Sequence, residues 1–157
     1  MPATSCIEEL RCHSEPWRCL ARRILPWSTQ GFSLAGEVLE VGGESGAMAA
    51  ELGRTDRQVR LTVTDLDPVM ARAARQRLAH LPHVVVHQAD ATRLPYKDGS
   101  FDAVTSFLML HHVIEWESAV SEASRVLRPG GMFLGYDLVA SRVASLVHLV
   151  DRSPHRL

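Results

Sequence analysis

"VLEVGGESG", residues 38–46, is the stretch that decides the fold predicted for this sequence. Its first residues suit a buried β-strand, and the glycines around Ser45 suit a tight turn that leads into the helical pattern "SGAMAAEL" at 45–52. Glycines in such a turn let a ligand approach the backbone, and the amides that begin a helix attract negative groups. Taken alone, the stretch is explained equally well as an ordinary strand-to-helix connection.

Strand and helix patterns alternate from this stretch to residue 150. Strands are predicted at 37–41, 60–65, 83–88, 101–107 and 132–137, and helices at 45–52, 67–81, 115–127 and 140–150. This alternation indicates βαβ units and therefore a parallel sheet that helices cover on both faces. The fold class predicted is α/β, with a Rossmann-like three-layer sandwich and a mostly parallel sheet.

Two segments give the clearest boundaries. Asp67 is placed to cap the helix at 67–81, Pro68 suits its first turn, and Pro82 ends the segment. "LRPGGM", at 127–132, predicts a helix exit and a tight turn before the last strand, where Gly130 or Gly131 can take a positive φ.

Length and composition indicate one soluble domain over residues 1–157. It divides into an N-terminal helical segment at 1–35, with a helix at 17–27, a core at 36–138, and a C-terminal helix and tail at 139–157. The net charge of −1 shows no excess that would attract nucleic acid or an acidic membrane surface. No stretch has the roughly 18–20 apolar residues that a membrane helix needs.

The cysteines favour a cytoplasmic protein. Cys6, Cys12 and Cys19 all lie in the first twenty residues, and an odd number without a secretory leader suggests reduced thiols. Their spacing matches none of the usual zinc motifs, so we expect no metal site.

Ligand-binding residues are expected directly after the strands, because such sheets bind ligands at the carboxyl ends of their strands. Asp65 ends the second strand, where an acid can accept the hydroxyl hydrogens of a ribose. The alternative is helix capping, for which Asp67 is better placed. Asp90 and Ala91 follow the third strand and offer a carboxylate and an amide for an adenine, although Asp90 is also explained as a solvated loop acid. Together these features favour a nucleoside pocket.

Five motifs resemble those of the class I S-adenosylmethionine-dependent methyltransferases that act on small molecules. They are "VLEVGGESG", "VTDLDPVM", "ADATRLPYKDGSFDAV", "LHHV" and "RVLRPGG", in this order over about 37–137. The resemblance implies S-adenosylmethionine as cofactor and the strand order 3-2-1-4-5. Relatives usually add two further strands, which are missing here. The last strand is therefore expected at an exposed edge, and a homodimer through that edge or through the 140–150 helix is predicted.

The resemblance also assigns residues to the cofactor. It implies that the loop residues Gly42, Gly43, Glu44 and Gly46 lie against the methionine part, that Asp65 holds the ribose, that Asp90 and Ala91 contact the adenine, and that Leu66, Phe107 and Leu108 line the same pocket. Glu40, which ends the first strand, is counted among the cofactor-binding residues. The family usually has glycine where Glu44 stands. We therefore expect the Glu44 side chain and its charge to weaken cofactor binding.

The chemistry expected is methyl transfer by in-line displacement. The enzyme would chiefly align a nucleophile with the methyl–sulfur bond and exclude water. His111 and His112 follow the fourth strand, where either could act as a base for a hydroxyl or a carbon acid. The alternative is that these histidines only pack or hydrogen-bond within their loop.

The function predicted is transfer of a methyl group from S-adenosylmethionine to a small molecule. A non-catalytic cofactor-binding module, or a degenerate or truncated methyltransferase that acts through protein contacts, is the alternative. A dinucleotide dehydrogenase is less favoured because the glycines do not spell G-x-G-x-x-G. A nucleic-acid methyltransferase ranks lower still, because the sequence has neither a basic stripe nor an acid-Pro-Pro-aromatic motif after the fourth strand.

Overall fold

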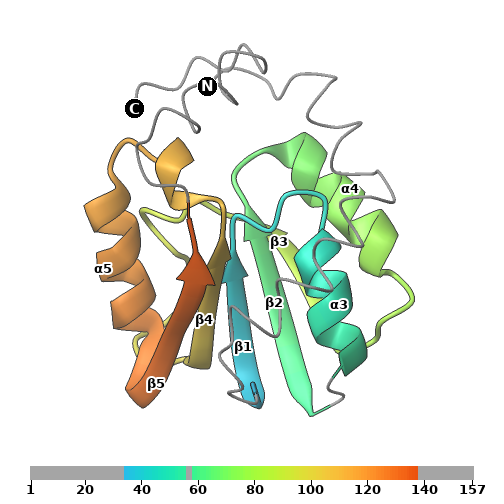
Figure 1. The fold of residues 1–157 in the computed structure, drawn as a ribbon, viewed down its shortest axis with the longest axis horizontal. Coiled ribbons are helices and arrows are strands. Elements are labelled where there is room, and N and C mark those ends of the chain that lie inside the picture. Colours follow the sequence, from blue (N-terminus) through green and yellow to red (C-terminus); the bar gives the residue numbers. More distant parts are fainter. Residues whose placement is uncertain (1–33, 56–57, 138–157) are drawn as a thin grey trace.

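The computed structural model describes residues 34–55 and 58–137. Strands and helices alternate along this part of the chain (Figure 1). They are β1 (Gly36–Val41), α3 (Ala47–Thr55), β2 (Val59–Asp65), α4 (Pro68–Leu78), β3 (Val84–Gln88), β4 (Phe101–Phe107), the 3-10 helix η1 (Leu110–His112), α5 (Trp116–Val126) and β5 (Leu127–Tyr136). The helices predicted at 17–27 and 140–150, and the three cysteines, lie outside the described residues.

The strands form one sheet in the order β3-β2-β1-β4-β5, as the resemblance implied. All four neighbouring pairs are parallel, so the prediction of a mostly parallel sheet is confirmed. β1 lies at the centre, and the chain crosses from β3 at one edge to β4 on the other side of β1. The strand order therefore reverses beside β1, and ligands of such sheets bind at this point, outside the carboxyl ends of the strands.

Helices cover both faces of the sheet and make three layers (Figure 1). α3 and α4 pack on one face through Met48, Leu52 and Leu78. α5 packs on the other face through Ala123 and Val126. Successive residues of β1 face opposite sides of the sheet. Val38 packs in the core beneath α3 and α4, and Leu39 packs in the core beneath α5. A strand buried on both faces is mostly apolar, which explains Val38, Leu39 and Val41, and Glu40 is the buried exception.

α4 begins as its sequence predicts. The Asp67 carboxylate accepts a hydrogen bond from the Val69 amide at 2.7 Å, and Pro68 occupies the first turn, where no amide hydrogen is needed. The helix ends at Leu78 rather than at the predicted residue 81, and the Leu81 amide donates instead to the Leu78 carbonyl. None of the described helices has the length and apolar composition required to cross a membrane.

β5 begins five residues earlier than predicted. Leu127 already pairs with Phe101, and regular pairing resumes between Met132 and Ala103. The residues at 128–131 therefore form an irregularity within the strand, with Gly130 at φ +82°, instead of a turn that precedes it. Such a bulge inserts residues into one strand while its partner continues, so composition alone reads it as a turn.

Candidate functional site

The loop between β1 and α3 has a left-handed backbone at three alternating positions. Gly42, Glu44 and Gly46 have φ values of +67°, +48° and +79°. A Cβ atom on Gly42 would lie only 2.0 Å from Cγ of Met109, so glycine is needed there for close packing as well as for backbone freedom. Glu44 takes a conformation that favours glycine, which matches the glycine implied there by the resemblance.

Hydrogen bonds hold this loop in its shape. The Gly43 amide donates to the Thr64 carbonyl at 2.9 Å, and the Glu44 amide donates to the Asp65 carboxylate at 2.8 Å. Ser45 does not directly precede α3, which begins at Ala47. Its hydroxyl accepts a hydrogen bond from the Arg77 guanidinium at 3.1 Å. The loop is thus tied to β2 and α4 on its two sides.

Glu40 places a buried carboxyl beside the loop. Its side chain is 2% exposed, and its Oε2 atom has no hydrogen-bond partner among the described residues. Burial raises the pKa of Glu40 to about 8, and the charges of Glu44 and Asp65 add to that effect. A buried acceptor without a donor costs free energy, so a cationic or hydrogen-bonding group placed beside Glu40 would be stabilised.

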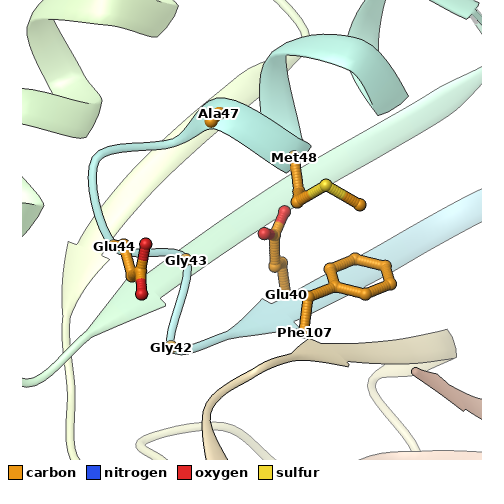
Figure 2. Close-up of a pocket in the computed structure, with 7 residues that line it drawn as sticks. All are labelled: Glu40, Gly42, Gly43, Glu44, Ala47, Met48 and Phe107. Carbon is orange, nitrogen blue, oxygen red and sulfur yellow. The ribbon is translucent and has the colours of Figure 1, made fainter. Parts of the chain in front are cut away.

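A small cavity lies where these features meet (Figure 2). Its lining residues are Glu40, Gly42, Gly43, Glu44, Ala47, Met48 and Phe107. The Glu40 carboxyl points toward the start of α3, between Met48 and Phe107 (Figure 2). The cavity volume of about 10 Å³ is close to the smallest that holds one water molecule. The cavity can therefore accept the end group of a ligand, and the rest of a nucleoside must lie elsewhere.

Asp65 lies at the end of β2 and forms two backbone hydrogen bonds. Besides the Glu44 amide, its carboxylate accepts from the Asp67 amide at 2.8 Å. Burial raises the pKa of Asp65, while the hydrogen bonds from Asp67 and Glu44 lower it. Asp65 therefore has a structural role even though Asp67, as expected, caps the helix. A carboxylate still has acceptor capacity beyond two hydrogen bonds, so a ribose hydroxyl can share it.

The predicted adenine residues lie after β3 and are more exposed. The Asp90 carboxylate accepts hydrogen bonds from the Thr92 amide at 2.8 Å and from its hydroxyl at 2.7 Å, as in an Asx turn. Ala91 packs against the core on the α5 side, and Leu66, after β2, is 37% exposed. Neither Asp65 nor these residues lines the cavity.

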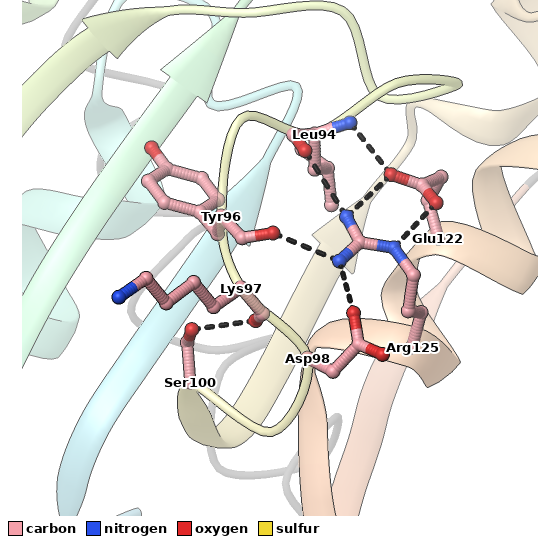
Figure 3. A network of polar contacts seen from close by, with 7 residues as sticks. All are labelled: Leu94, Tyr96, Lys97, Asp98, Ser100, Glu122 and Arg125. Atoms are coloured by element: carbon pink, nitrogen blue, oxygen red, sulfur yellow. Dashed lines mark hydrogen bonds and ion pairs between the residues drawn. The ribbon is translucent and has the colours of Figure 1, made fainter.

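Arg125 of α5 holds the segment that follows Asp90 (Figure 3). Its guanidinium donates to the carbonyls of Leu94 and Tyr96 and to the Asp98 carboxylate, at 3.1, 2.8 and 2.7 Å. Glu122 orients the guanidinium through two further hydrogen bonds and accepts from the Leu94 amide at 2.8 Å. The hydrogen bonds to Asp98 and Glu122 raise the pKa of Arg125, with that to Glu122 contributing most.

The residues after β4 bring an imidazole and a carboxylate together. His111 Nδ1 lies within hydrogen-bond distance of Asp137 Oδ1, and Asp137 Oδ2 also accepts from the Leu110 amide at 2.6 Å. The His111 side chain is 6% exposed, and its ring centroid lies 3.9 Å from that of His112. A carboxylate at Nδ1 stabilises the tautomer that leaves Nε2 able to accept a proton. Only His111 of the two candidate bases has this arrangement in the described part of the chain.

Phe107, which ends β4, and Leu108, which follows it, both contact Tyr136 of β5. Phe107 is buried and lines the cavity, and its ring lies 5.5 Å from that of Tyr136. Leu108 has φ +54°, and its amide donates to the Tyr136 carbonyl at 2.9 Å. Burial raises the pKa of Tyr136 to about 12, and the charges of Glu40 and Glu44 contribute. Two non-glycine residues with left-handed backbone, Leu108 and Glu44, thus follow neighbouring strands.

Sequence reasoning missed several residues of this site. Met48 and Ala47 line the cavity, and Tyr136 and Asp137 approach the site from the end of β5. The sequence offered a reason to consider Asp137 as a site residue, because it stands at the end of an apolar strand, as Asp65 and Asp90 do. One feature of the site fits S-adenosylmethionine: Glu40 Oε2, which has no hydrogen-bond partner among the described residues, can accept from an ammonium group. Glu44 is the residue that does not match.

Comparison with known proteins identifies the family. A sequence model of the methyltransferase domain matches residues 39–135, which is more than half of the chain, and the chain belongs to this methyltransferase family. A demethylmenaquinone methyltransferase from Clavibacter sepedonicus is 37% identical over 134 residues, covering 75% of this chain and 54% of the relative. The chain spans about half the length of this curated relative, as it does of a second relative from Mycobacterium ulcerans.

Solved structures agree with this family and show a range of activities. A SAM-dependent methyltransferase from Thermotoga maritima has 27% identity and a TM-score of 0.61, covering 77% of this chain and 55% of that protein. The [4+2]-cyclase SpnF also has 27% identity, with a TM-score of 0.67 and coverage of 76% and 44%. The resemblance to class I methyltransferases is therefore confirmed, and with it the α/β fold.

Proposed function

We propose that this protein transfers a methyl group from S-adenosylmethionine to a small-molecule acceptor in the cytoplasm. The observation that carries the proposal is the buried Glu40 carboxyl, whose Oε2 has no partner among the described residues and which lines a cavity beneath the glycine loop. Together with family membership, this arrangement supports an adenosyl ligand whose cationic end points toward Glu40. The name of one relative, a demethylmenaquinone methyltransferase, supports a small-molecule acceptor.

The residues proposed to hold the cofactor lie along the carboxyl ends of β1, β2, β3 and β4. The loop at 42–46 and Glu40 would contact the methionine part, Asp65 the ribose, and Asp90 with Ala91 the adenine. Leu66, Phe107 and Leu108 would supply apolar contacts. The cofactor supplies an electrophilic methyl group when it is bound, so the protein needs no covalent nucleophile.

His111 is the residue proposed to accept the proton of the acceptor. Asp137, bonded to Nδ1, would hold the imidazole in the tautomer that leaves Nε2 as the base and would stabilise the protonated ring. The His111 side chain is 6% exposed, so little of the ring is in contact with water. A hydroxyl or a carbon acid is the acceptor type that benefits from such a base.

A non-catalytic cofactor-binding module is the second candidate. One observation favours it: Glu44, with φ +48°, stands where the family resemblance implies a glycine. A protein of this kind would bind the cofactor and act through protein contacts.

Calorimetric titration with S-adenosylhomocysteine, followed by methyl-transfer assays with a panel of hydroxyl and carbon acceptors, tests both candidates. We expect saturable binding and formation of S-adenosylhomocysteine from S-adenosylmethionine with at least one acceptor. Binding without turnover supports the module. Absence of binding by every adenosyl ligand contradicts both.

A further inference from the structure

We propose that Arg125 and Glu122 of α5 are positioning residues for the nucleobase, because they fix the turn that carries Asp90. The proposal rests on the adenosyl pocket proposed above, in which Asp90 accepts from the exocyclic amino group of adenine. It adds two residues from another element of the fold. Their expected effect is on the preference of the site for adenine over other purines.

The connection between β3 and β4 depends on α5 for its backbone hydrogen bonds. Residues 89–100 form this connection without a helix, whereas α3, α4 and α5 lie in the other three connections. Leu94 is 4% exposed, so both of its backbone groups need partners within the protein. Its amide donates to the Glu122 carboxylate at 2.8 Å, and its carbonyl accepts from the Arg125 guanidinium at 3.1 Å. Side chains of α5 thus replace the hydrogen bonds that a helix would supply.

Every N–H group of the Arg125 guanidinium has an acceptor (Figure 3). Two of them donate to the Glu122 carboxylate, at 2.7 and 2.8 Å. The others donate to the carbonyls of Leu94 and Tyr96 and to the Asp98 carboxylate. These donors lie in one rigid plane, so together the acceptors determine the orientation of the guanidinium. The segment is therefore held at a fixed position against α5.

The held segment is joined directly to the turn of Asp90. The amide of Arg93, which precedes Leu94, donates to the Asp90 carbonyl at 3.1 Å, and the two residues form an isolated β-bridge. On the other side of the turn, the Ala89 amide donates to the Asp65 carbonyl at 3.0 Å. The turn is thus fixed at both ends, by β2 and by α5. Loss of the hydrogen bonds to α5 would weaken one of these two attachments.

The Asp90 carboxylate has acceptor capacity left for a ligand. The hydrogen bonds from the Thr92 amide and hydroxyl both reach Oδ1. Oδ2 can therefore accept from the exocyclic amino group of adenine. Hypoxanthine has a carbonyl oxygen in place of that group, and a carboxylate repels it. Because hydrogen bonds weaken steeply with poor geometry, this discrimination depends on a turn that stays in place.

The test compares S-adenosylhomocysteine with its deaminated analogue, in which hypoxanthine replaces adenine. Both are titrated calorimetrically into the wild type, Arg125→Lys and Glu122→Gln. We expect the wild type to bind the adenine ligand about 100-fold more tightly, since a hydrogen bond to a charged acceptor is lost in the analogue. Arg125→Lys should lower this ratio to about tenfold, because lysine lacks the forked set of donors. Glu122→Gln should lower the ratio as well, and it answers the question if Arg125→Lys does not fold.

A double substitution shows whether Arg125 acts through Asp90. Asp90→Asn should bring the ratio close to one, and adding Arg125→Lys to it should cause no further change. Arg60→Lys is the matched control, because Arg60 pairs with Glu37 at the amino ends of β2 and β1, away from residues 89–100. It should leave the ratio unchanged.

A loss of stability alone would weaken both ligands by the same factor and leave the ratio as it is. The inference is overturned if Arg125→Lys and Glu122→Gln keep the ratio of the wild type, or if the double variant differs from Asp90→Asn. A wild type that binds both ligands equally also overturns it. In these cases the adenosyl pocket itself survives, since binding is observed. Failure of both ligands to bind overturns the pocket and the inference together.

Discussion

Glu40 is the residue whose protonation most directly affects stability. Its folded-state pKa of about 8 lies above the ordinary value of 4.5, so the folded protein holds a proton that the unfolded chain releases between these pH values. The free energy of unfolding therefore decreases as the pH rises through this window. A shift of this size corresponds to at most about 5 kcal/mol.

Glu40→Gln should remove this pH dependence. We expect the variant to be more stable than the wild type at about pH 9 and close to it at about pH 4, because the amide never carries the charge that burial disfavours. Chemical denaturation across this pH range measures the difference, with Glu117→Gln, which removes an exposed carboxylate of α5, as the control. Parallel curves for Glu40→Gln and the wild type would contradict the assignment of a raised pKa.

His111 and Asp137 should act together if His111 is the base. With an acceptor identified by the panel, His111→Gln is expected to lower kcat by about 100-fold, because general-base assistance is of this order. Asp137→Asn should lower kcat and alter the pH profile while KM for the acceptor changes less, since Asp137 positions the imidazole. His112→Gln is the matched control and should have a much smaller effect. Equal losses for His111→Gln and His112→Gln would argue against this role.

At the scale of elements, Arg125 connects α5 to the connection between β3 and β4. Its guanidinium donates hydrogen bonds to the carbonyls of Leu94 and Tyr96 and to the Asp98 carboxylate. A lysine cannot reproduce this planar, forked set of donors. Arg125→Lys should therefore increase amide hydrogen exchange in residues 94–98, as measured by mass spectrometry.

Arg54→Lys is the control for this experiment, because Arg54 forms an exposed pair within α3. It should leave exchange at 94–98 unchanged. Unaltered exchange in Arg125→Lys would show that the segment is held mainly by the packing of Leu94 and Tyr96 against the core.

Apolar patterning predicts the elements of this fold well, and β5 shows where it fails. The first four strands, β1 to β4, begin within one residue of their predicted positions. Strands that are buried in a sheet appear in the sequence as short apolar runs, so the sequence marks where they begin. "RPGG" reads as a turn, yet it forms a bulge in β5, since pairing between Leu127 and Phe101 depends on a strand far away in the chain.

The site was predictable in position but less so in its contacts. Five of the residues expected to bind the cofactor, Glu40, Gly42, Gly43, Glu44 and Phe107, line one cavity, while their role toward a cofactor stays a prediction. Asp137 could be suspected as a site residue, but its pairing with His111 was not predictable, because Asp137 follows β5 and lies 26 residues further along the chain. The second role of Asp65, as an acceptor for the Glu44 amide, likewise depends on tertiary structure.

For the whole molecule, β5 is expected to mediate self-association. It is an edge strand of the sheet in the described residues and is twice as long as β3, the strand at the other edge (ten and five residues). Edge strands offer unpaired backbone groups, and Phe133 adds apolar surface that is 39% exposed. We therefore expect a dimer that forms with increasing concentration, measured by light scattering after size exclusion.

Phe133→Lys should shift this equilibrium toward the monomer. Val85→Lys is the matched control, because Val85 is an exposed apolar residue of the opposite edge strand, β3. A wild-type protein that stays monomeric at high concentration contradicts the prediction, as does a Val85→Lys variant that dissociates as readily as Phe133→Lys.

The hydrogen bonds of Asp65 have a consequence for the thermodynamics of binding. With no ligand present, this carboxylate already orders the Glu44 amide on one side and the Asp67 amide on the other. The conformational entropy of the loop is thus lost during folding and not during association, which favours affinity. A ribose that arrives at Asp65 would meet a rigid receptor. Its binding should then proceed in a single kinetic step, with little change in the order of the loop.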